Sequence, residues 1–196
     1  MDPYQSTDEE LMHEFQQGNS DAMAVIFNRH KHKAFNFALR FLNNRADAED
    51  AFSEAVALVC EKRMSYQPRA KFITWFYTII RNVSIMKIRR NQQFLSFRVK
   101  NEKGDLEDMP LIDTQELTPQ TMARHETAQQ VQKAISELPL EQKEALILRE
   151  YQELSYTEIA GVLNCSLEKV KILIYRARTQ LQETIPSLII KEGGNP

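Results

Sequence analysis

Apolar side chains recur every three or four residues along most of the first 95 positions, which is the period of an α-helix. Residues 7–10 read Thr-Asp-Glu-Glu, a capping box that predicts a short first helix ending at Gly18. Ser20 is expected to cap a long second helix, and a third helix is expected to start near Asp47. After a break, a fourth is expected from Phe72. The pattern therefore predicts four helices in this part of the chain.

The helical period is lost over residues 96–119. This segment contains glycine, proline and five acidic side chains between positions 105 and 116, so we expect a flexible acidic linker. Thr118-Pro119 then opens a second helical part, because proline is favoured at the first position of a helix. The predicted fold is all-α, with two small helical domains at 1–95 and 120–190 joined by the linker.

Composition changes this picture little. The chain has 196 residues and a net charge of −2, and its 42% hydrophobic share suits an ordinary folded protein. The longest uncharged apolar run, 72–80, has nine residues, against the roughly 18 needed to span a bilayer. The acidic N-terminus is unlike a signal peptide, so we expect no membrane insertion and a cytoplasmic location. Two cysteines and four histidines lack metal-ligand spacing, so no metal and no cofactor are expected.

The sharpest local pattern is a helix-turn-helix in the C-terminal domain, at residues 154–178. Ser155 and Ser166 are placed to cap two short helices, with Glu158 completing a capping box on the first. Such a motif places its second helix in the major groove of DNA. The residues expected on the exposed side of that helix are mostly basic: Lys169, Lys171, Tyr175, Arg176 and Arg178. A plain helical hairpin with a solvated basic face is the other interpretation.

A second pattern combines aromatic and basic side chains in the fourth helix. Residues 81–103 contain seven Lys or Arg and a single acid, which suits a nucleic-acid strand. Four apolar side chains share one helix face and are more simply explained as core: Phe72, Trp75, Phe76 and Ile79. The basic residues and Asn82 are then expected on the open face.

The third helix begins with an acidic segment, Asp-Ala-Glu-Asp at 47–50, with Glu54 one turn further on. Asp47 and Asp50 lie three apart and so share a face, where helix capping is their default role. Paired carboxylates also occur in glycosidases. No phosphate-binding loop, nucleophile elbow or metal set accompanies them, so we predict that the protein is not an enzyme.

Taken in order, these motifs resemble the extracytoplasmic-function sigma factors of the sigma-70 family. The shared features are the Asp-Ala-Glu-Asp helix, a Phe-x-x-Trp-x-Tyr-x-Ile-x-Arg-Asn helix ending in Arg-Arg, an acidic linker, and the C-terminal Ser-Tyr-x-Glu-Ile-Ala to Tyr-Arg-Ala-Arg segment. The resemblance covers residues 5–95 and 120–185. It implies an alternative sigma factor that binds bacterial core RNA polymerase and directs it to promoter DNA for transcription initiation, without catalysis of its own.

The resemblance also implies site residues. The residues expected to contact core polymerase are Asp47, Asp50 and Glu54. Binding of the −10 element, including a flipped base, falls to Tyr66, Arg69, Lys71, Asn82, Arg89 and Arg90. Binding of the −35 duplex falls to Arg149, Lys169, Lys171, Tyr175, Arg176 and Arg178.

The chain departs from the family pattern at Ser53, where many relatives have Gln, and at 85–87, where they often have Asp or Asn. The first departure weakens one expected polymerase contact, and the second leaves the −10 preference open. The linker acids could imitate phosphate in a polymerase channel or keep a tether extended. No sensor domain is visible, so the family resemblance suggests control by an anti-sigma factor. A dimeric helix-turn-helix regulator and a helical adaptor without DNA contact are the alternatives.

Overall fold

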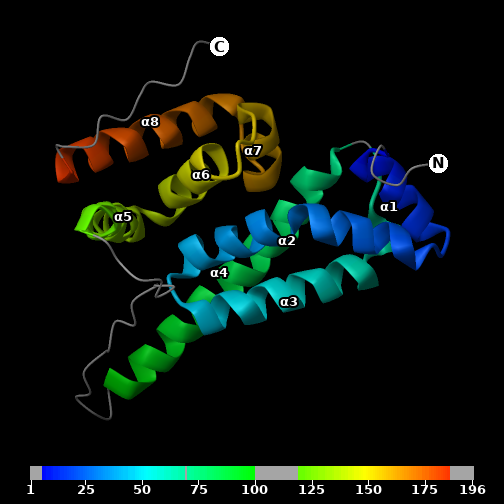
Figure 1. Cartoon of the computed structure of the whole chain (residues 1–196), viewed down its shortest axis with the longest axis horizontal. Coiled ribbons are helices and arrows are strands. Elements are labelled where there is room, and N and C mark those ends of the chain that lie inside the picture. Colours follow the sequence, from blue (N-terminus) through cyan, green and yellow to red (C-terminus); the bar gives the residue numbers. More distant parts are fainter. Residues whose placement is uncertain (1–5, 69, 100–118, 186–196) are drawn as a thin grey trace. The chain divides into compact units, whose positions relative to one another are not determined.

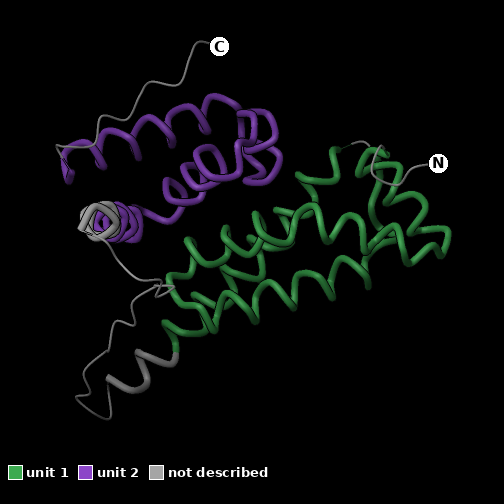
Figure 2. The backbone as a smooth tube through the Cα atoms, in the orientation of Figure 1, with its two compact units in different colours: residues 1–111 green, residues 112–196 purple. Residues whose placement is uncertain are grey.

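The computed structural model describes residues 6–68, 70–99 and 119–185, with side chains described for 6–68, 70–93 and 128–185, and all its regular elements are helices (Figure 1). The chain divides into two compact units, residues 1–111 and 112–196 (Figure 2). The predicted all-α class and its two helical parts are confirmed. Each unit has its own hydrophobic core.

Unit 1 contains four α-helices and one short 3-10 helix among the described residues. Their bounds are α1 Asp8–Gln16, α2 Ser20–Leu42, α3 Arg45–Glu61, η1 Arg63–Ser65 and α4 Phe72–Val99. Helix α2 packs against α1, α3 and α4, and α3 also packs against α4. The segment between α3 and α4, residues 62–71, lies next to α1, because α1 contacts both η1 and α4.

The core of unit 1 pairs a small-residue face with large aromatic rings. The buried face of α3 is Ala48, Ala51, Ala55 and Val59, at helical spacing. Small side chains let neighbouring helices approach closely. The rings of Phe37 and Tyr77 meet edge to face, 5.4 Å apart between centroids, in the same core. This interior supports the surfaces of α3 and α4 that face outward.

The helix starts agree only in part with the sequence prediction. The capping box of residues 7–10 is present at α1, as expected. Ser20, however, is the first helical residue of α2, and Asn19 is the cap, accepting from the N–H of Asp21. Likewise α3 begins at Arg45 because Asn44 caps it, accepting from the N–H of Asp47 at 3.0 Å. Asp47 therefore lies in the first turn and is not the cap.

Unit 2 has four helices among its described residues. Their bounds are α5 Pro119–Ser136, α6 Leu140–Glu150, α7 Tyr156–Leu163 and α8 Leu167–Thr184. Helix α8 packs against α5, α6 and α7, and its buried face is Val170, Leu173, Ile174, Ala177 and Leu181. Pro119 is the first residue of α5, as predicted from the proline preference.

The expected linker is helical at its start. Helix α4 continues to Val99, so residues 96–99 extend the helix, since no glycine or proline occurs between Phe72 and Val99 to end it. The rest of the linker and its acids at 105–116 lie outside the described residues. Within the described ranges, no helix has the length and hydrophobicity to cross a membrane. The same residues form no cluster of three potential metal ligands.

Candidate nucleic-acid interface

The loop between α3 and α4, residues 62–71, is built around a buried tyrosine. Tyr66 is only 4% exposed, and its ring packs 5.3 Å from Trp75 and 6.1 Å from Phe72 between centroids. Its hydroxyl donates a hydrogen bond to the carbonyl of Ala70 at 3.0 Å. Burial, together with the charges of Glu9 and Asp8, raises the pKa of Tyr66 to about 12. Tyr66 therefore supports the loop from beneath and offers no ring face for a base to stack on.

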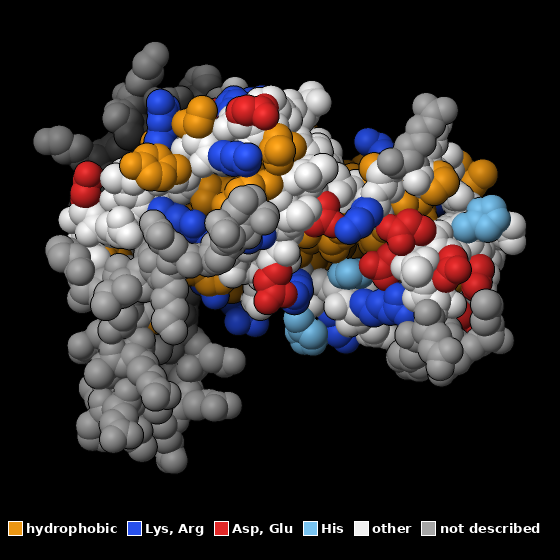
Figure 3. Space-filling view, turned by 90° about the horizontal axis from the view of Figure 1, so that it is seen from above, with side chains coloured by type: hydrophobic (Ala, Val, Ile, Leu, Met, Phe, Trp, Pro, Cys, Tyr) orange, Lys and Arg blue, Asp and Glu red, His pale blue; other side chains and the backbone are white. Residues whose placement is uncertain are grey.

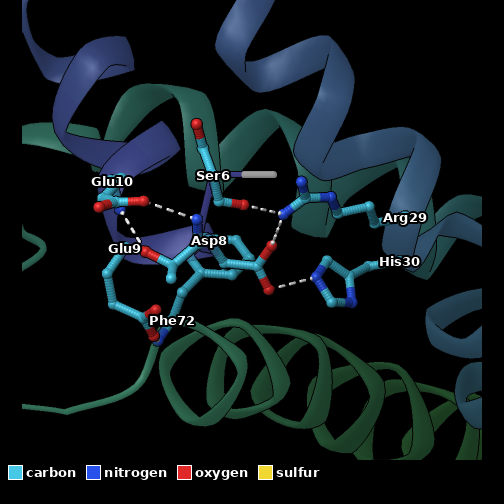
Figure 4. Close-up of polar contacts among 8 residues, drawn as sticks. Ser6, Asp8, Glu9, Glu10, Arg29, His30 and Phe72 are labelled. Carbon is cyan, nitrogen blue, oxygen red and sulfur yellow. Dashed lines mark hydrogen bonds and ion pairs between the residues drawn. The ribbon is translucent and has the colours of Figure 1, made fainter. Parts of the chain in front are cut away.

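A polar network fixes α1 to α2 beside this loop (Figure 4). One carboxylate oxygen of Asp8 accepts from Arg29 at 2.9 Å, and the other lies 2.6 Å from Nε2 of His30. Arg29 also donates to the carbonyl of Ser6 at 2.8 Å. Burial acts to raise the pKa of Asp8, but the hydrogen bonds and charges of His30 and Arg29 outweigh it and hold that pKa below its usual value. Asp8 is thus a charged, structural group.

The open face of α4 carries the other predicted −10 residues. Asn82, Arg89 and Arg90 are exposed, as is Lys71 immediately before the helix. Met86, 57% exposed, lies one turn from Asn82 and from Arg90 and so continues the same face. Arg69 lies outside the described residues. The structure thus brings four of the six predicted −10 residues to the surface of the loop and α4.

The aromatic residues of α4 divide between core and surface. Phe72 and Phe76 are buried, as predicted. Trp75 and Ile79 are only half-buried, so the expectation that all four form core was too broad. Trp75 lies seven residues before Asn82, so its exposed edge belongs to the open face that ends in Arg89. That spacing, 75–82–89, was the sequence signal that would have placed Trp75 at this surface.

The predicted polymerase-contact residues of α3 are partly engaged by α4. Asp47 accepts from the side-chain amide of Asn91 at 2.9 Å. Asp50, whose side chain is 73% exposed, pairs with Lys87 at 3.3 Å. Glu54 is exposed one turn further along α3. Asp50 and Glu54 therefore form an open acidic surface on α3 beside the half-buried Asp47, and Asp47 and Asp50 also connect this surface to α4.

Helices α7 and α8 form the predicted helix-turn-helix. Ser155 accepts from the N–H of Glu158 at 3.2 Å, and the Glu158 carboxylate accepts from the N–H of Ser155 at 2.8 Å. Ser166 accepts from the N–H of Lys169 and caps α8. Between the helices Asn164 has φ 50° and ψ 53°, a left-handed conformation that asparagine tolerates better than most residues. Both predicted caps are confirmed, and the turn has only three residues.

The exposed face of α8 combines two cations with two apolar side chains. Lys171 and Arg176 are exposed and have no ion-pair partner among the described residues. Tyr175, 70% exposed, and Ile172, 49% exposed, lie between them around the helix axis. Figure 3, seen from the side of α8, shows Lys and Arg side chains interspersed with hydrophobic ones over this helix. Cations can neutralise phosphates, and apolar groups suit the thymine methyl in a major groove.

Three predicted −35 residues are held by the domain itself. Lys169 pairs with Glu141 of α6 at 2.8 Å, and this hydrogen bond raises its pKa. Two nitrogens of Arg178 donate to Glu150 at 2.6 and 3.2 Å. Arg149 donates to the carbonyl of Leu154 and stacks 4.9 Å from the centre of the Tyr156 ring. The structure therefore separates the six basic or aromatic candidates into an open set on α8 and a set that ties α8 and the α6–α7 turn together.

Sequence reasoning did not assign Ile172 to this face. The sequence does indicate this position, because the buried face of α8 has its helical spacing without Ile172. Position 172 lies on the side of the helix opposite Ile174, so its side chain is expected to face outward.

Both halves of the chain match models of one family. Residues 26–94 match the model described as sigma-70 region 2, and residues 128–181 match sigma-70 region 4. The chain is 30% identical over 193 residues to the ECF RNA polymerase sigma-E factor of Haemophilus influenzae, covering 94% of this chain and 98% of that protein. It is 29% identical over 173 residues to the ECF RNA polymerase sigma factor SigW of Bacillus subtilis, covering 87% and 92%.

Two solved structures share the fold. CnrH, in complex with the cytosolic domain of CnrY, has a TM-score of 0.68 at 20% identity, covering 92% of this chain and 98% of that one. The sigma factor RpoE of Bartonella quintana, in complex with the anti-sigma factor NepR, has a TM-score of 0.65 at 21% identity, covering 89% and 98%.

Regions 2 and 4 in this order, on two helical units, define a sigma-70-type transcription factor. With the similarity extending over nearly its whole length, the chain belongs to the extracytoplasmic-function sigma factors of that family. It is therefore an RNA polymerase sigma factor of transcription initiation, in a family of regulatory transcription factors and not of enzymes.

Proposed function

We propose that the two units of this sigma factor divide the recognition of a promoter between them. Unit 1 binds core polymerase through Asp47, Asp50 and Glu54 of α3, and binds the −10 strand through the 62–71 loop and the open face of α4. Unit 2 reads the −35 duplex with the open face of α8. The chain itself catalyses nothing, because the polymerase supplies the chemistry, and it works in the cytoplasm where that polymerase is found.

The observation that carries this proposal is the exposed face of α8. Lys171 and Arg176, which have no ion-pair partner in the described part of the chain, flank Ile172 and Tyr175 on the second helix of a helix-turn-helix, while Lys169 and Arg178 are held by acids of α6. A basic face that is merely solvated does not explain two large exposed apolar side chains at its centre. A helix that binds in the major groove does explain them, because base edges there present both polar atoms and methyl groups.

An anti-sigma factor is the proposed regulator. The relatives CnrH and RpoE were solved in complex with CnrY and the anti-sigma factor NepR, respectively. The exposed acids of α3 and the open face of α4 are the surfaces whose coverage would block polymerase and DNA together. A partner that binds there would keep the sigma factor inactive until a signal releases it.

Run-off transcription tests the proposal. Purified chain is mixed with bacterial core polymerase and a library of genomic promoter fragments, and the transcripts are mapped. We expect transcripts that start at a small set of sites sharing two sequence elements, and none with core enzyme alone. Co-elution of the chain with core polymerase in gel filtration accompanies this result. A chain that binds duplex DNA as a dimer but never joins polymerase would contradict the proposal.

A further inference from the structure

Side chains of α1 hold one end of the 62–71 loop. Nε2 of Gln16 donates to the carbonyl of Arg63 at 2.8 Å and to the carbonyl of Tyr66 at 3.0 Å. These two carbonyls stand at the beginning of η1 and immediately after it, so one amide group fixes both sides of this turn. The Arg63 guanidinium lies 5.6 Å above the ring of Phe15, which adds a second contact from α1.

A second side chain of α1 holds the other end of the loop. Oε1 of Glu9 accepts a hydrogen bond from the N–H of Phe72 at 2.9 Å (Figure 4). Phe72 is the first residue of α4, and the N–H groups of a first turn have no acceptor within their own helix. Glu9 therefore caps α4 from another helix, and its negative charge is favourable at that helix end.

Helix α1 can hold the loop in place because α1 is itself bound to α2. Asp8, next to Glu9, is fixed by Arg29 and His30 of α2. The His30 ring also lies 6.0 Å from the ring of Phe72. The loop thus spans two points, near Arg63 and at Phe72, that are both attached to the same anchored helix.

We propose that Gln16 and Glu9 are positioning residues for capture of the −10 strand. They touch no DNA, and they hold the two ends of the loop in place, at Arg63 and Tyr66 and at Phe72, before DNA arrives. This inference rests on the proposed function, in which the loop and α4 take the −10 strand. If the competent loop shape is populated only part of the time, the affinity for the strand falls by that fraction. A loop held in advance avoids this loss and the cost of ordering on binding.

Gln16→Met tests the first contact, because it keeps the length of the side chain and removes the donor. Gln17→Met is the matched control, since Gln17 is exposed and its amide lies 2.9 Å from Nε2 of His13 on the same helix. Binding to three probes is measured for both full-length chains. The first probe is core polymerase, added to the chain alone. The other two are added to the assembled complex with core polymerase: the −35 duplex and the single-stranded −10 segment of a promoter identified by run-off transcription.

We expect Gln16→Met to bind the −10 strand about tenfold less tightly, the effect of losing two hydrogen bonds. Its affinities for core polymerase and for the −35 duplex are expected to match those of Gln17→Met. Equal −10 affinity for the two variants would overturn the inference. So would an equal loss for all three probes, because that result means general destabilisation. Failure of the wild-type chain to bind the −10 strand would instead overturn the proposed function.

The chain's only tryptophan provides a readout that needs neither DNA nor polymerase. Trp75 lies directly against Tyr66, so its fluorescence reports the packing under the loop. In the free protein we expect Gln16→Met to raise the quenching of Trp75 by iodide, with Gln17→Met unchanged. Unaltered quenching in Gln16→Met would contradict a loop held by Gln16, whatever the DNA measurements show.

Glu9 offers rescue by a conservative change. Glu9→Gln keeps an oxygen acceptor for the Phe72 N–H, whereas Glu9→Met removes it. We expect Glu9→Gln to retain most of the −10 affinity and Glu9→Met to lose it, at equal affinity for the −35 duplex. Equal −10 binding by the two variants would contradict a positioning role for the Glu9 acceptor.

Discussion

At the scale of single residues, the site depends on groups whose protonation is fixed by their surroundings. Tyr66 keeps its proton far into the alkaline range because it is buried near Glu9 and Asp8. Asp8 keeps its charge into the acid range because His30 and Arg29 bind the carboxylate. Tyr66 belongs to the loop between α3 and α4, and Asp8 lies on α1, which is next to that loop. The protonation states of these two groups are therefore constant near neutral pH and change only towards the acid extreme for Asp8 and the alkaline extreme for Tyr66.

Tyr66→Phe removes the hydrogen bond to Ala70, which we expect to cost about 1 kcal/mol of unfolding free energy at neutral pH. The pKa of Tyr66 is raised in the folded state, so the stability it contributes is present below pH 10 and is lost as pH rises towards about 12. Urea unfolding at a series of alkaline pH values should therefore show a steeper decline for wild type than for Tyr66→Phe. Parallel declines would contradict this assignment.

Asp8→Asn tests the opposite end of the pH scale. The pKa of Asp8 is lowered in the folded state, so its stabilisation is present above pH 3.8 and is lost as pH falls below that value. We expect the variant to be less stable at pH 7 by about 1.5–3 kcal/mol, the range for hydrogen bonds to charged groups. Its stability should also fall less between pH 4 and pH 2. Urea unfolding followed by Trp75 fluorescence measures both quantities.

At the scale of helices, the sequence predicted where caps occur better than which residue forms them. Ser155 and Ser166 were identified correctly because the residues immediately before them, Leu154 and Cys165, do not compete for the helix end. Ser20 was wrong because Asn19 precedes it and binds the same helix end. Several polar residues in succession can each cap a helix, and only the path of the chain decides among them.

The sequence also could not show which side chains on the basic face of α8 are bound by other helices. Its period and charge identified a recognition helix, but they could not tell which cations are open. Lys169 and Arg178 find their acids on α6, 28 residues away along the chain, at Glu141 and Glu150. Tyr66 was likewise predicted at the site and found beneath it, because its burial depends on the packing of α1 and α4.

Arg176→Ala and Arg178→Ala make a matched pair on α8. Arg176 is open, so its loss should weaken binding to the −35 duplex by about 1–3 kcal/mol at one base position and leave the melting temperature unchanged. Arg178 is bound to Glu150, so its loss should mainly lower the melting temperature. Titrations with duplexes mutated one base pair at a time, together with thermal unfolding, separate the two. A uniform loss over all sequences would make Arg176 a phosphate contact.

At the scale of the whole molecule, the two candidate surfaces of unit 1 are joined by side chains. Asp47 and Asp50 of α3 bind Asn91 and Lys87 of α4. Lys87 occupies one of the positions where the chain departs from the family pattern, and it faces α3 with little exposure. The proposed polymerase contact on α3 and the proposed DNA contact on α4 therefore lie on two adjacent helices that these side chains connect.

Asp50→Lys should weaken binding to core polymerase at least tenfold, because it replaces an exposed acid of the proposed contact with a cation facing Lys87. Glu61→Lys, at the other end of the same helix, is the charge-matched control and should bind as wild type does. Affinity is measured with labelled core enzyme, and urea unfolding checks that both variants fold. If Asp50→Lys and Glu61→Lys bind core polymerase equally well, Asp50 does not contact the polymerase and only pairs with Lys87.

The cap that Glu9 places on α4 also has a consequence for protein synthesis. Glu9 is made 63 residues before the N–H that it will bind, which on a ribosome adding about 5–20 residues per second is a delay on the order of several seconds. The ion pairs of unit 2 join partners only 28 residues apart and can form sooner after their residues emerge. The loop between α3 and α4 therefore cannot be held at both of its ends until Phe72 has been made, long after Gln16 and Glu9 of the first helix.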